Sequence, residues 1–178
     1  MARRTDRRGG VSPPPERTGV LGAAELVDFA EALAESLDRR DDLLDARPRD
    51  RVYEEIWSDD YVNAWVIRWA DDSDTGFHDH DTSTAGIVVV SGSLREERLA
   101  LSGPPVTRSF AAGSSFHLPA SAIHRVRHGG GAPALTVNAY SPPLRRQGVY
   151  RVAPDGALER DSTPYTEELR AAIGGPSA

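Results

Sequence analysis

Two histidines of this chain, His78 and His80, stand two positions apart, directly before a β-branched apolar run. In extended backbone, residues at positions i and i+2 project from the same face, so both imidazoles can point at one ion. Neutral imidazole is a common ligand for iron, zinc, copper and nickel. The His-x-His pair alone is a weak signal, because HDH among aspartates also fits a polar loop. A metal site needs a third ligand from elsewhere in the chain.

The third candidate ligand is His124, in the segment GSSFHLPASAIHRVRH. A barrel can bring such a residue beside the His78 and His80 pair if it lies on a distant antiparallel strand. With this third imidazole, the sequence favours a metal centre over a polar loop. His117 suits a structural or exposed position, and His128 ends a strand before a run of glycines, so we leave both outside the centre.

The composition restricts the classes of protein that remain possible. The chain has 178 residues, no cysteine and a net charge of -6. Without cysteine, any metal must be held by His, Asp or Glu. The negative charge argues against a nucleic-acid partner, and no apolar run is long enough to cross a bilayer. The basic start MARRTDRR is not followed by the apolar segment of a signal peptide, so we expect a cytoplasmic protein that acts on small molecules.

The first sixty residues read as an arm followed by helices. Residues 1–18 mix charge, glycine and proline with almost no apolar content, which predicts a flexible arm. Residues 19–60 are expected to form a helical segment packed on the main body, because apolar side chains recur at helical spacing. Pro48 can open a second short helix in this segment. The residues expected on its buried side are Val52, Ile56 and Trp57.

Residues 61–178 have the pattern of a β-barrel followed by a helix. The apolar period drops to two after residue 60, with Trp65, Ile67 and Trp69 expected on one face. Further strands are expected at residues 85–90, 94–101, 106–110, 114–118, 123–128, 133–140 and 149–153. The segment TEELRAAIGG predicts a C-terminal helix that starts at Thr163 or Thr166. Turn signals at short regular intervals indicate an all-β sandwich or barrel with flanking helices.

The strand at 133–140 carries its polar residues on one face. Thr136, Asn138 and Tyr140 alternate with apolar residues, so we expect them to share the inner side of the barrel. A polar inner face suits a barrel that holds a ligand. Tyr140 also fits a packing aromatic with its hydroxyl at the rim.

These segments resemble the cysteine dioxygenase family of thiol dioxygenases, within the cupin superfamily. The resemblance covers about residues 50–155 and rests on HDH at 78–80, Gly92, IHRV at 123–126 and AYSPPL at 139–144. The YSPP after a strand is its most specific element, because cupins in general lack it. The family implies a cupin-type double-stranded β-helix. The second cupin motif, which includes His124, also matches in spacing.

The resemblance implies an Fe(II) site with His78, His80 and His124 as ligands. Cupins in general supply a glutamate five residues after the second histidine, where this chain has Ala85. The implied reaction uses O2 to oxidise a small thiol, cysteine-like or a mercapto acid, to its sulfinic acid. Some family members carry a cysteine at the position of Ala85, and this cysteine crosslinks to the active-site tyrosine. Alanine cannot form that bond.

Tyr140 matches the active-site tyrosine of the family and is the catalytic candidate. The candidate substrate-binding residues are Asn138, Thr136, Trp69 and Arg51. In the family a histidine two residues before the tyrosine completes a Ser-x-His-x-Tyr relay, whereas this chain has Asn138, which can bind Tyr140 but cannot carry a proton.

The family's carboxylate-binding arginine precedes the strand of Trp69. Arg51 lies near this position but out of register, and Tyr53 and Glu55 are expected closer to it. Arg68 should point away from Trp69. Arg145 and Arg146, after the SPPL segment, are possible replacements, although solvated loop positions suit them better.

Two other functions fit the same residues. A cupin can use the same metal for chemistry that involves no sulfur. A degenerate cupin can bind a small ligand without turnover, and the replacement of the relay histidine by Asn138 motivates this alternative.

Overall fold

The computed structural model describes residues 19–37, 51–71, 73–100 and 102–165. The expected arm at 1–18, Pro48 and the C-terminal helix from Thr166 onward lie outside these ranges. None of the helices in the described part of the chain has the length and apolar character needed to cross a membrane.

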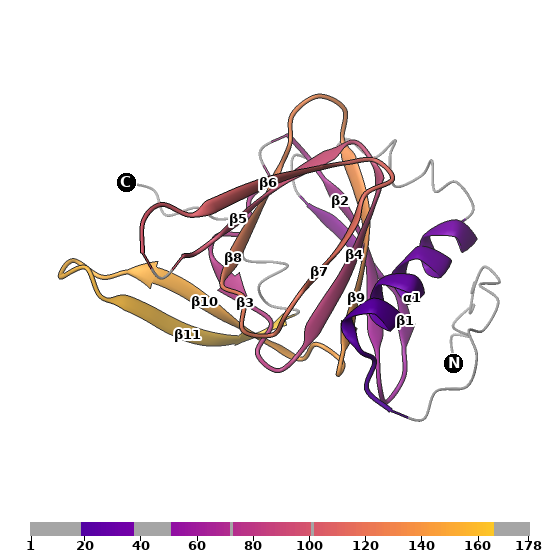
Figure 1. Ribbon diagram of the computed structural model, residues 1–178, viewed down its shortest axis with the longest axis horizontal. Helices are drawn as coiled ribbons and strands as arrows, with labels where there is room; N and C mark the ends of the chain where they lie inside the picture. The colour runs from indigo at the N-terminus through magenta and orange to yellow at the C-terminus, as the bar shows by residue number, and fades with distance from the viewer. Residues whose placement is uncertain (1–18, 38–50, 72, 101, 166–178) are drawn as a thin grey trace, which may run out of the picture.

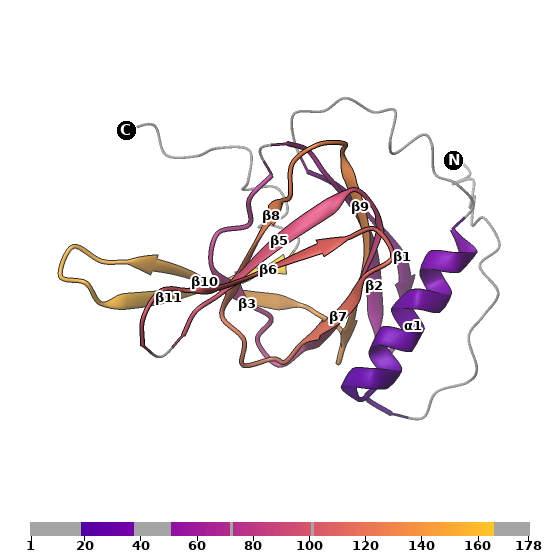
Figure 2. The ribbon, with the colours of Figure 1, turned by 45° about the horizontal axis from the view of Figure 1, so that its top comes forward.

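Within the described residues, eleven antiparallel strands form two sheets that face one another (Figures 1 and 2). The five-stranded sheet has the order β1(Val52–Ser58), β2(Asn63–Trp69), β9(Ala134–Ser141), β4(Thr84–Ser91), β7(Ser115–Leu118). The six-stranded sheet has the order β11(Leu158–Pro164), β10(Arg146–Val152), β3(His78–Asp79), β8(His124–His128), β5(Ser93–Arg98), β6(Val106–Ala111). This two-sheet jelly roll confirms the expected all-β fold.

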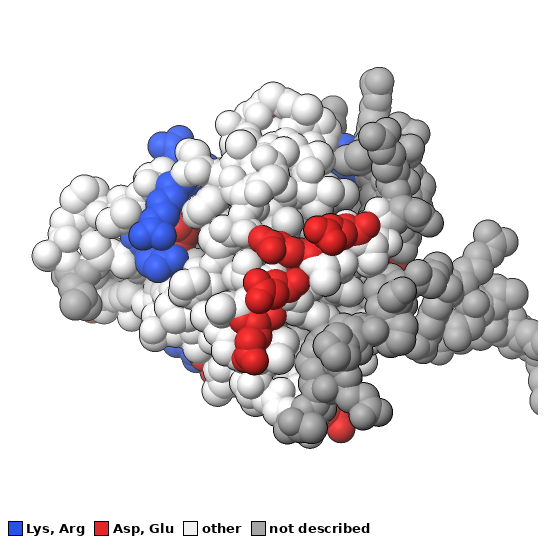
Figure 3. Space-filling model, turned by 45° about the vertical axis from the view of Figure 1, so that its right-hand side comes forward, with Lys and Arg blue, Asp and Glu red and all other residues white. Residues whose placement is uncertain are grey.

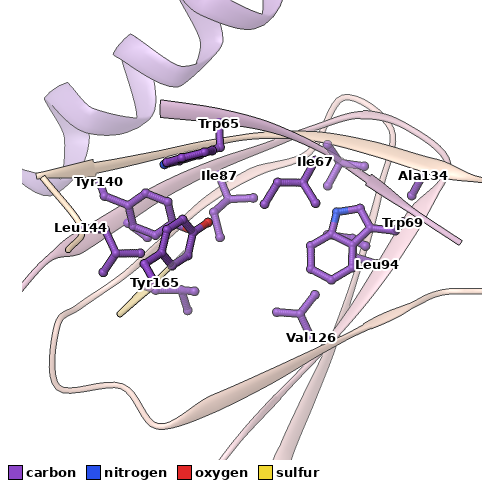
Figure 4. Packing of buried hydrophobic residues seen from close by; sticks show 13 residues of the cluster. Trp65, Ile67, Trp69, Ile87, Leu94, Val126, Ala134, Tyr140, Leu144 and Tyr165 are labelled. Atoms are coloured by element: carbon purple, nitrogen blue, oxygen red, sulfur yellow. The ribbon is translucent and has the colours of Figure 1, made fainter. Parts of the chain in front are cut away.

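The core lies between the inner faces of the two sheets. Trp65, Ile67 and Trp69 of β2 all point into it, as the period of two predicted. Leu94 and Val126 of the six-stranded sheet pack against them from the opposite side (Figure 4). Because both sheets contribute apolar residues to one cluster, the strands are held at a fixed separation around the interior.

Helix α1(Ala23–Ser36) covers the outer face of the five-stranded sheet. Its apolar stripe, which includes Leu26, Phe29 and Leu33, is buried against that face. Gly86 of β4 lies beneath the helix, and a Cβ atom there would stand 2.6 Å from the carbonyl oxygen of Leu26. The opposite side of the helix is acidic, and Figure 3 shows acidic side chains gathered on this face of the molecule. The expected first helix is therefore confirmed.

The expected second helix is wrong where the structure describes it, because residues 52–58 form strand β1. Val52 and Ile56 are four residues apart, which is a helical spacing. The strand contains a bulge between Glu55 and Trp57, however, and this extra residue disturbs the alternation that marks a strand. The β-branched and aromatic residues of this segment favour a strand, and the strand pairs with β2. Trp57 packs edge-on against Phe29 of α1, with 6.0 Å between ring centroids.

The strands expected from residue 61 onward are present, with small shifts at their ends. Two others were missed. β3 is only two residues long, and β11 has an exposed, polar sequence with no apolar alternation. Thr163 belongs to β11, so the C-terminal helix does not start there.

Candidate metal centre

Three buried histidines meet inside the jelly roll. His78 lies on β3 directly opposite His124 at the start of β8, and His80 follows two residues after His78. One ring nitrogen from each lies within 4.8 Å of the others, and the Nε2 atoms of His80 and His124 are 3.3 Å apart. The structure thus brings together the three imidazoles that the sequence singled out.

The environment of these rings keeps them neutral. Burial lowers the pKa of His78 to about 4 and lowers the pKa of His80 and His124 well below the ordinary value. His78 pairs its Nδ1 with the carbonyl oxygen of Gly76 at 3.1 Å, which makes Nδ1 the protonated nitrogen. The lone pair of Nε2 then faces the cluster. Three neutral nitrogen donors of this kind fit a divalent transition metal.

A cavity of about 30 Å³ lies beside the histidines. Its wall is partly apolar, with Ile67, Ile87 and Val126 contributing. The polar and aromatic residues on the wall are Arg51, Trp69, Thr75, Asn138, Tyr140, Gln147 and Tyr165. Four of the five candidate catalytic and substrate-binding residues are in this set. The fifth, Thr136, lies behind the wall and contacts Asn138.

A chain of hydrogen bonds runs along this wall to Tyr140. Trp69 donates its indole N–H to Oγ1 of Thr136 at 3.0 Å, and Thr136 donates to Oδ1 of Asn138 at 2.7 Å. The indole is a donor only, so Thr136 accepts from it, and the Thr136 hydroxyl donates onward. This places the amide nitrogen of Asn138 toward Tyr140, whose hydroxyl oxygen it contacts at 3.4 Å.

Tyr140 stands between this chain and the histidines. Its ring packs edge-on against His80, with 5.0 Å between centroids, and it is 3% exposed. On the neighbouring strand β4, Ala85 lies directly opposite it. Tyr165 contacts the Tyr140 ring from the other side (Figure 4). The phenol is therefore held at the edge of the histidine cluster by packing on two sides.

A family model described as cysteine dioxygenase type I matches residues 44–151, which is more than half of the chain. The chain belongs to this family. The family resemblance identified in the sequence is therefore confirmed. A search of curated proteins found no match.

Solved structures agree on the fold of this cysteine dioxygenase family member. TT1209 from Thermus thermophilus is 17% identical, with a TM-score of 0.51 over 60% of this chain and 97% of that one. BH2720 from Bacillus halodurans is 18% identical, with a TM-score of 0.51 over 69% and 86%. A Klebsiella pneumoniae protein with a double-stranded β-helix domain is 11% identical, with a TM-score of 0.50 over 70% and 95%. At these identities the likeness concerns the fold alone.

Arg51 reaches the cavity, contrary to the expected register. Its guanidinium lies 5.4 Å from the ring centroid of Trp69, and its buried Nε has no hydrogen-bond partner among the described residues. Tyr53 instead packs against Trp65, and Glu55 is exposed, so the expectation that these two stand closer to the site is wrong. The bulge in β1 adds one residue between Arg51 and Trp69, which explains the error.

The other three arginines considered in the sequence lie away from the site. Arg68 is buried on the opposite face of β2 from Trp69, as expected from alternation. Arg145 and Arg146 are exposed, and Arg146 donates to Ser162 of β11. They occupy the solvated positions that suit them better.

The two remaining histidines are also outside the cluster. His117 is exposed on β7. His128 is buried, donates from Nε2 to the carbonyl oxygen of Ala132 at 2.9 Å and accepts at Nδ1 from Gly130. Its two ring nitrogens hold the loop after β8, which is a structural role.

Gln147 is a residue of the cavity wall that the sequence did not indicate. It lies on β10, is 4% exposed, and its Oε1 is buried with no partner in the described part of the chain. The strand was expected to begin at residue 149, two residues too late to include it. A buried polar atom without a protein partner beside a cavity is open to a hydrogen bond from a water or a bound molecule.

Proposed function

We propose that this protein is an O2-dependent thiol dioxygenase that uses Fe(II) to oxidise a small thiol to its sulfinic acid. The observation that carries this proposal is the cluster of three buried, neutral imidazoles beside a partly polar cavity. Membership of the cysteine dioxygenase type I family supports it. The substrate enters as RSH and leaves as RSO2H, so both oxygen atoms come from O2 and no external reductant is needed.

His78, His80 and His124 would hold the iron through nitrogen alone. Ala85 stands where cupins in general place a glutamate ligand, so the donor set carries no charge. When bound, the iron supplies coordination of the thiolate and of O2, which brings sulfur and oxygen together. A metal also favours the thiolate form of the substrate, because only the deprotonated thiol is a good ligand.

Arg51 is our candidate for binding a substrate carboxylate. Its buried Nε lies on the cavity wall without a partner among the described residues, and an ionised carboxylate would satisfy it. The contact with Trp69 holds the guanidinium plane in place. These features favour a thiol that also carries a carboxylate, either cysteine-like or a mercapto acid.

Gln147 adds a second polar group to the proposed substrate site. Its Oε1, which has no partner in the described ranges, is an acceptor, so it would receive a hydrogen bond from an N–H or O–H of the bound molecule. Gln147 belongs to the six-stranded sheet, whereas Arg51 directly precedes β1 of the five-stranded sheet. A substrate bound to both would be held from two sides of the interior.

Tyr140 is the proposed catalytic residue. It accepts a weak hydrogen bond from the Asn138 amide, and a phenol can donate a hydrogen bond to a substrate or to oxygen. Asn138 cannot pass a proton along the chain, so it would orient the phenol rather than supply it with a proton. The apolar wall limits the entry of water to the reacting atoms.

A ligand-binding protein without turnover is the alternative that Asn138 supports. An orienting amide in place of a relay histidine is compatible with binding that leads to no reaction. Product analysis separates the two functions, because only a thiol dioxygenase adds two oxygen atoms to the sulfur.

The decisive experiment measures O2 uptake by the iron-loaded full chain with cysteine, 3-mercaptopropionate, cysteamine and mercaptosuccinate. We expect uptake and a sulfinic acid product with at least one carboxylated thiol. The His124→Ala variant should lose both iron and activity, while His117→Ala, which changes an exposed histidine outside the cluster, should keep both. Bound iron with no O2 uptake for any of the four thiols contradicts the proposal.

A further inference from the structure

Asp79, between His78 and His80, points away from the histidine cluster. Strand alternation turns its carboxylate toward the hairpin formed by β10 and β11. There the carboxylate accepts hydrogen bonds from several donors. These are the backbone N–H of Asp81 at 2.8 Å and of Gly148 at 3.1 Å, the Tyr150 hydroxyl at 2.6 Å, and Arg160 through Nε at 2.7 Å and Nη2 at 2.9 Å.

Most of these donors come from one hairpin. Figures 1 and 2 show β10 and β11 extending from the body on the side away from α1, with β10 alongside β3. Gly148 pairs directly with Asp79, and a Cβ atom there would lie 2.6 Å from Oδ2 of Asp79 and would also collide with Arg160. Glycine at this position therefore allows the guanidinium to approach the carboxylate.

The strand that carries the first histidine has little backbone support of its own. β3 is two residues long and pairs with β8 only at His78 and His124. Its pairing with β10 involves His78 and Asp79 alone. Arg160 also contacts Asp81 at 3.3 Å, so its guanidinium spans the segment on either side of His80. The side-chain network therefore supplies restraint that so short a strand lacks.

We propose that Arg160 is a positioning residue for the metal centre, acting through Asp79 to hold the backbone of residues 78–80. The two-point contact between guanidinium and carboxylate restricts both translation and rotation of this segment. This keeps the imidazoles of His78 and His80 aimed at His124. The inference rests on the metal centre of the proposed function but is independent of the thiol chemistry. Residues that support metal ligands indirectly commonly change metal affinity by about 10- to 100-fold when they are removed.

The test is a Co(II) titration of the full chain, in which visible absorption reports both affinity and ligand geometry. In Arg160→Met we expect the Kd for Co(II) to rise by about tenfold, with a changed absorption spectrum. The matched control is Arg151→Met in the same hairpin. Arg151 is exposed and its ion pairs are with Glu159 and Asp161, away from Asp79, so both Kd and spectrum should stay as in the wild type.

A second variant covers the case in which Arg160→Met fails to fold. Tyr150→Phe removes one hydrogen bond to Asp79 and keeps the ion pair, so we expect a smaller change in the same direction. Arg160→Lys keeps the charge but loses the two-point contact with Asp79. Its affinity for Co(II) should lie between those of the wild type and Arg160→Met.

The inference would be overturned if a folded Arg160→Met variant kept the wild-type Kd and spectrum. If Arg160→Met does not fold, the same result in Tyr150→Phe would overturn it. Either result leaves the proposed function intact. A wild-type chain that binds no Co(II) or Fe(II) would overturn the metal centre, and both proposals with it. An active enzyme is not required for either result.

Discussion

The indole N–H of Trp69 donates to Oγ1 of Thr136 at 3.0 Å, and this contact begins the hydrogen-bond chain that ends at Tyr140. Because tryptophan offers no acceptor, Oγ1 of Thr136 is the acceptor in this contact. The Thr136 hydroxyl in turn donates to Oδ1 of Asn138, and the amide nitrogen faces Tyr140.

The Thr136→Val variant should therefore destabilise the fold. It keeps the shape of the side chain but leaves the indole N–H and Oδ1 of Asn138 buried without their partner. We expect a loss of about 1–3 kcal/mol in the free energy of unfolding, measured by urea denaturation. Thr136→Ser keeps the hydroxyl and serves as the control. Equal stability of the valine and serine variants would show that the hydrogen bonds contribute little.

Tyr140→Phe should separate catalysis from metal binding. The phenol is no part of the three-histidine cluster, so the affinity for iron should be unchanged. Loss of the hydroxyl removes the proposed hydrogen-bond donor, and we expect kcat to fall by about 100-fold. Steady-state O2 uptake and an iron titration on the same preparation test this. Full activity in the variant would assign Tyr140 a packing role.

Arg51→Leu should affect carboxylated thiols selectively. Loss of a charged hydrogen bond corresponds to about 1.5–3 kcal/mol, or roughly a 10- to 100-fold lower kcat/KM for cysteine or 3-mercaptopropionate. Cysteamine has no carboxylate, so any activity toward it should change little. Arg146→Leu removes an exposed arginine outside the cavity and should leave all the thiols unaffected. An equal loss for every thiol would place the effect of Arg51 on the fold rather than on the substrate.

The metal-free protein should lose stability in mildly acidic solution. Burial lowers the pKa of His78 from the ordinary 6.5 to about 4, so the unfolded chain binds a proton before the folded one does. The stabilisation is complete above pH 6.5, decreases as the pH falls, and is lost by about pH 4. His78 alone accounts for about 3 kcal/mol. Urea unfolding between pH 4 and pH 7 measures the slope, and His78→Gln should reduce it.

The alternation of residues predicted much of this molecule correctly. It placed Trp65, Ile67 and Trp69 on the inner face, and it put Thr136, Asn138 and Tyr140 on one side of their strand. Both predictions follow from the period of two, because the direction of each side chain in a strand depends only on its position in the local backbone. The same period applied to His78 and His80 indicated that they share a face.

Features that depend on partners distant in the chain were missed. The bulge at Ile56 adds a single residue to β1 and has no distinct sequence signal, so the register of Arg51 was misjudged. β11 is an edge strand with polar residues on both faces, and its pairing depends on β10. Gln147 lies at the beginning of the same hairpin. Its place on the cavity wall depends on the pairing of β10 with β3 and β11, which composition does not reveal.

Ala85 faces Tyr140 across two neighbouring strands, and the chain contains no cysteine at all. Under the proposed function, the only sulfur able to become a thiolate in this interior arrives with each substrate molecule. The phenol needs no maturation step before its first turnover and can acquire no thioether later. A freshly translated enzyme and one that has turned over substrate for hours should thus oxidise substrate at the same rate. Both should migrate as one species on a denaturing gel.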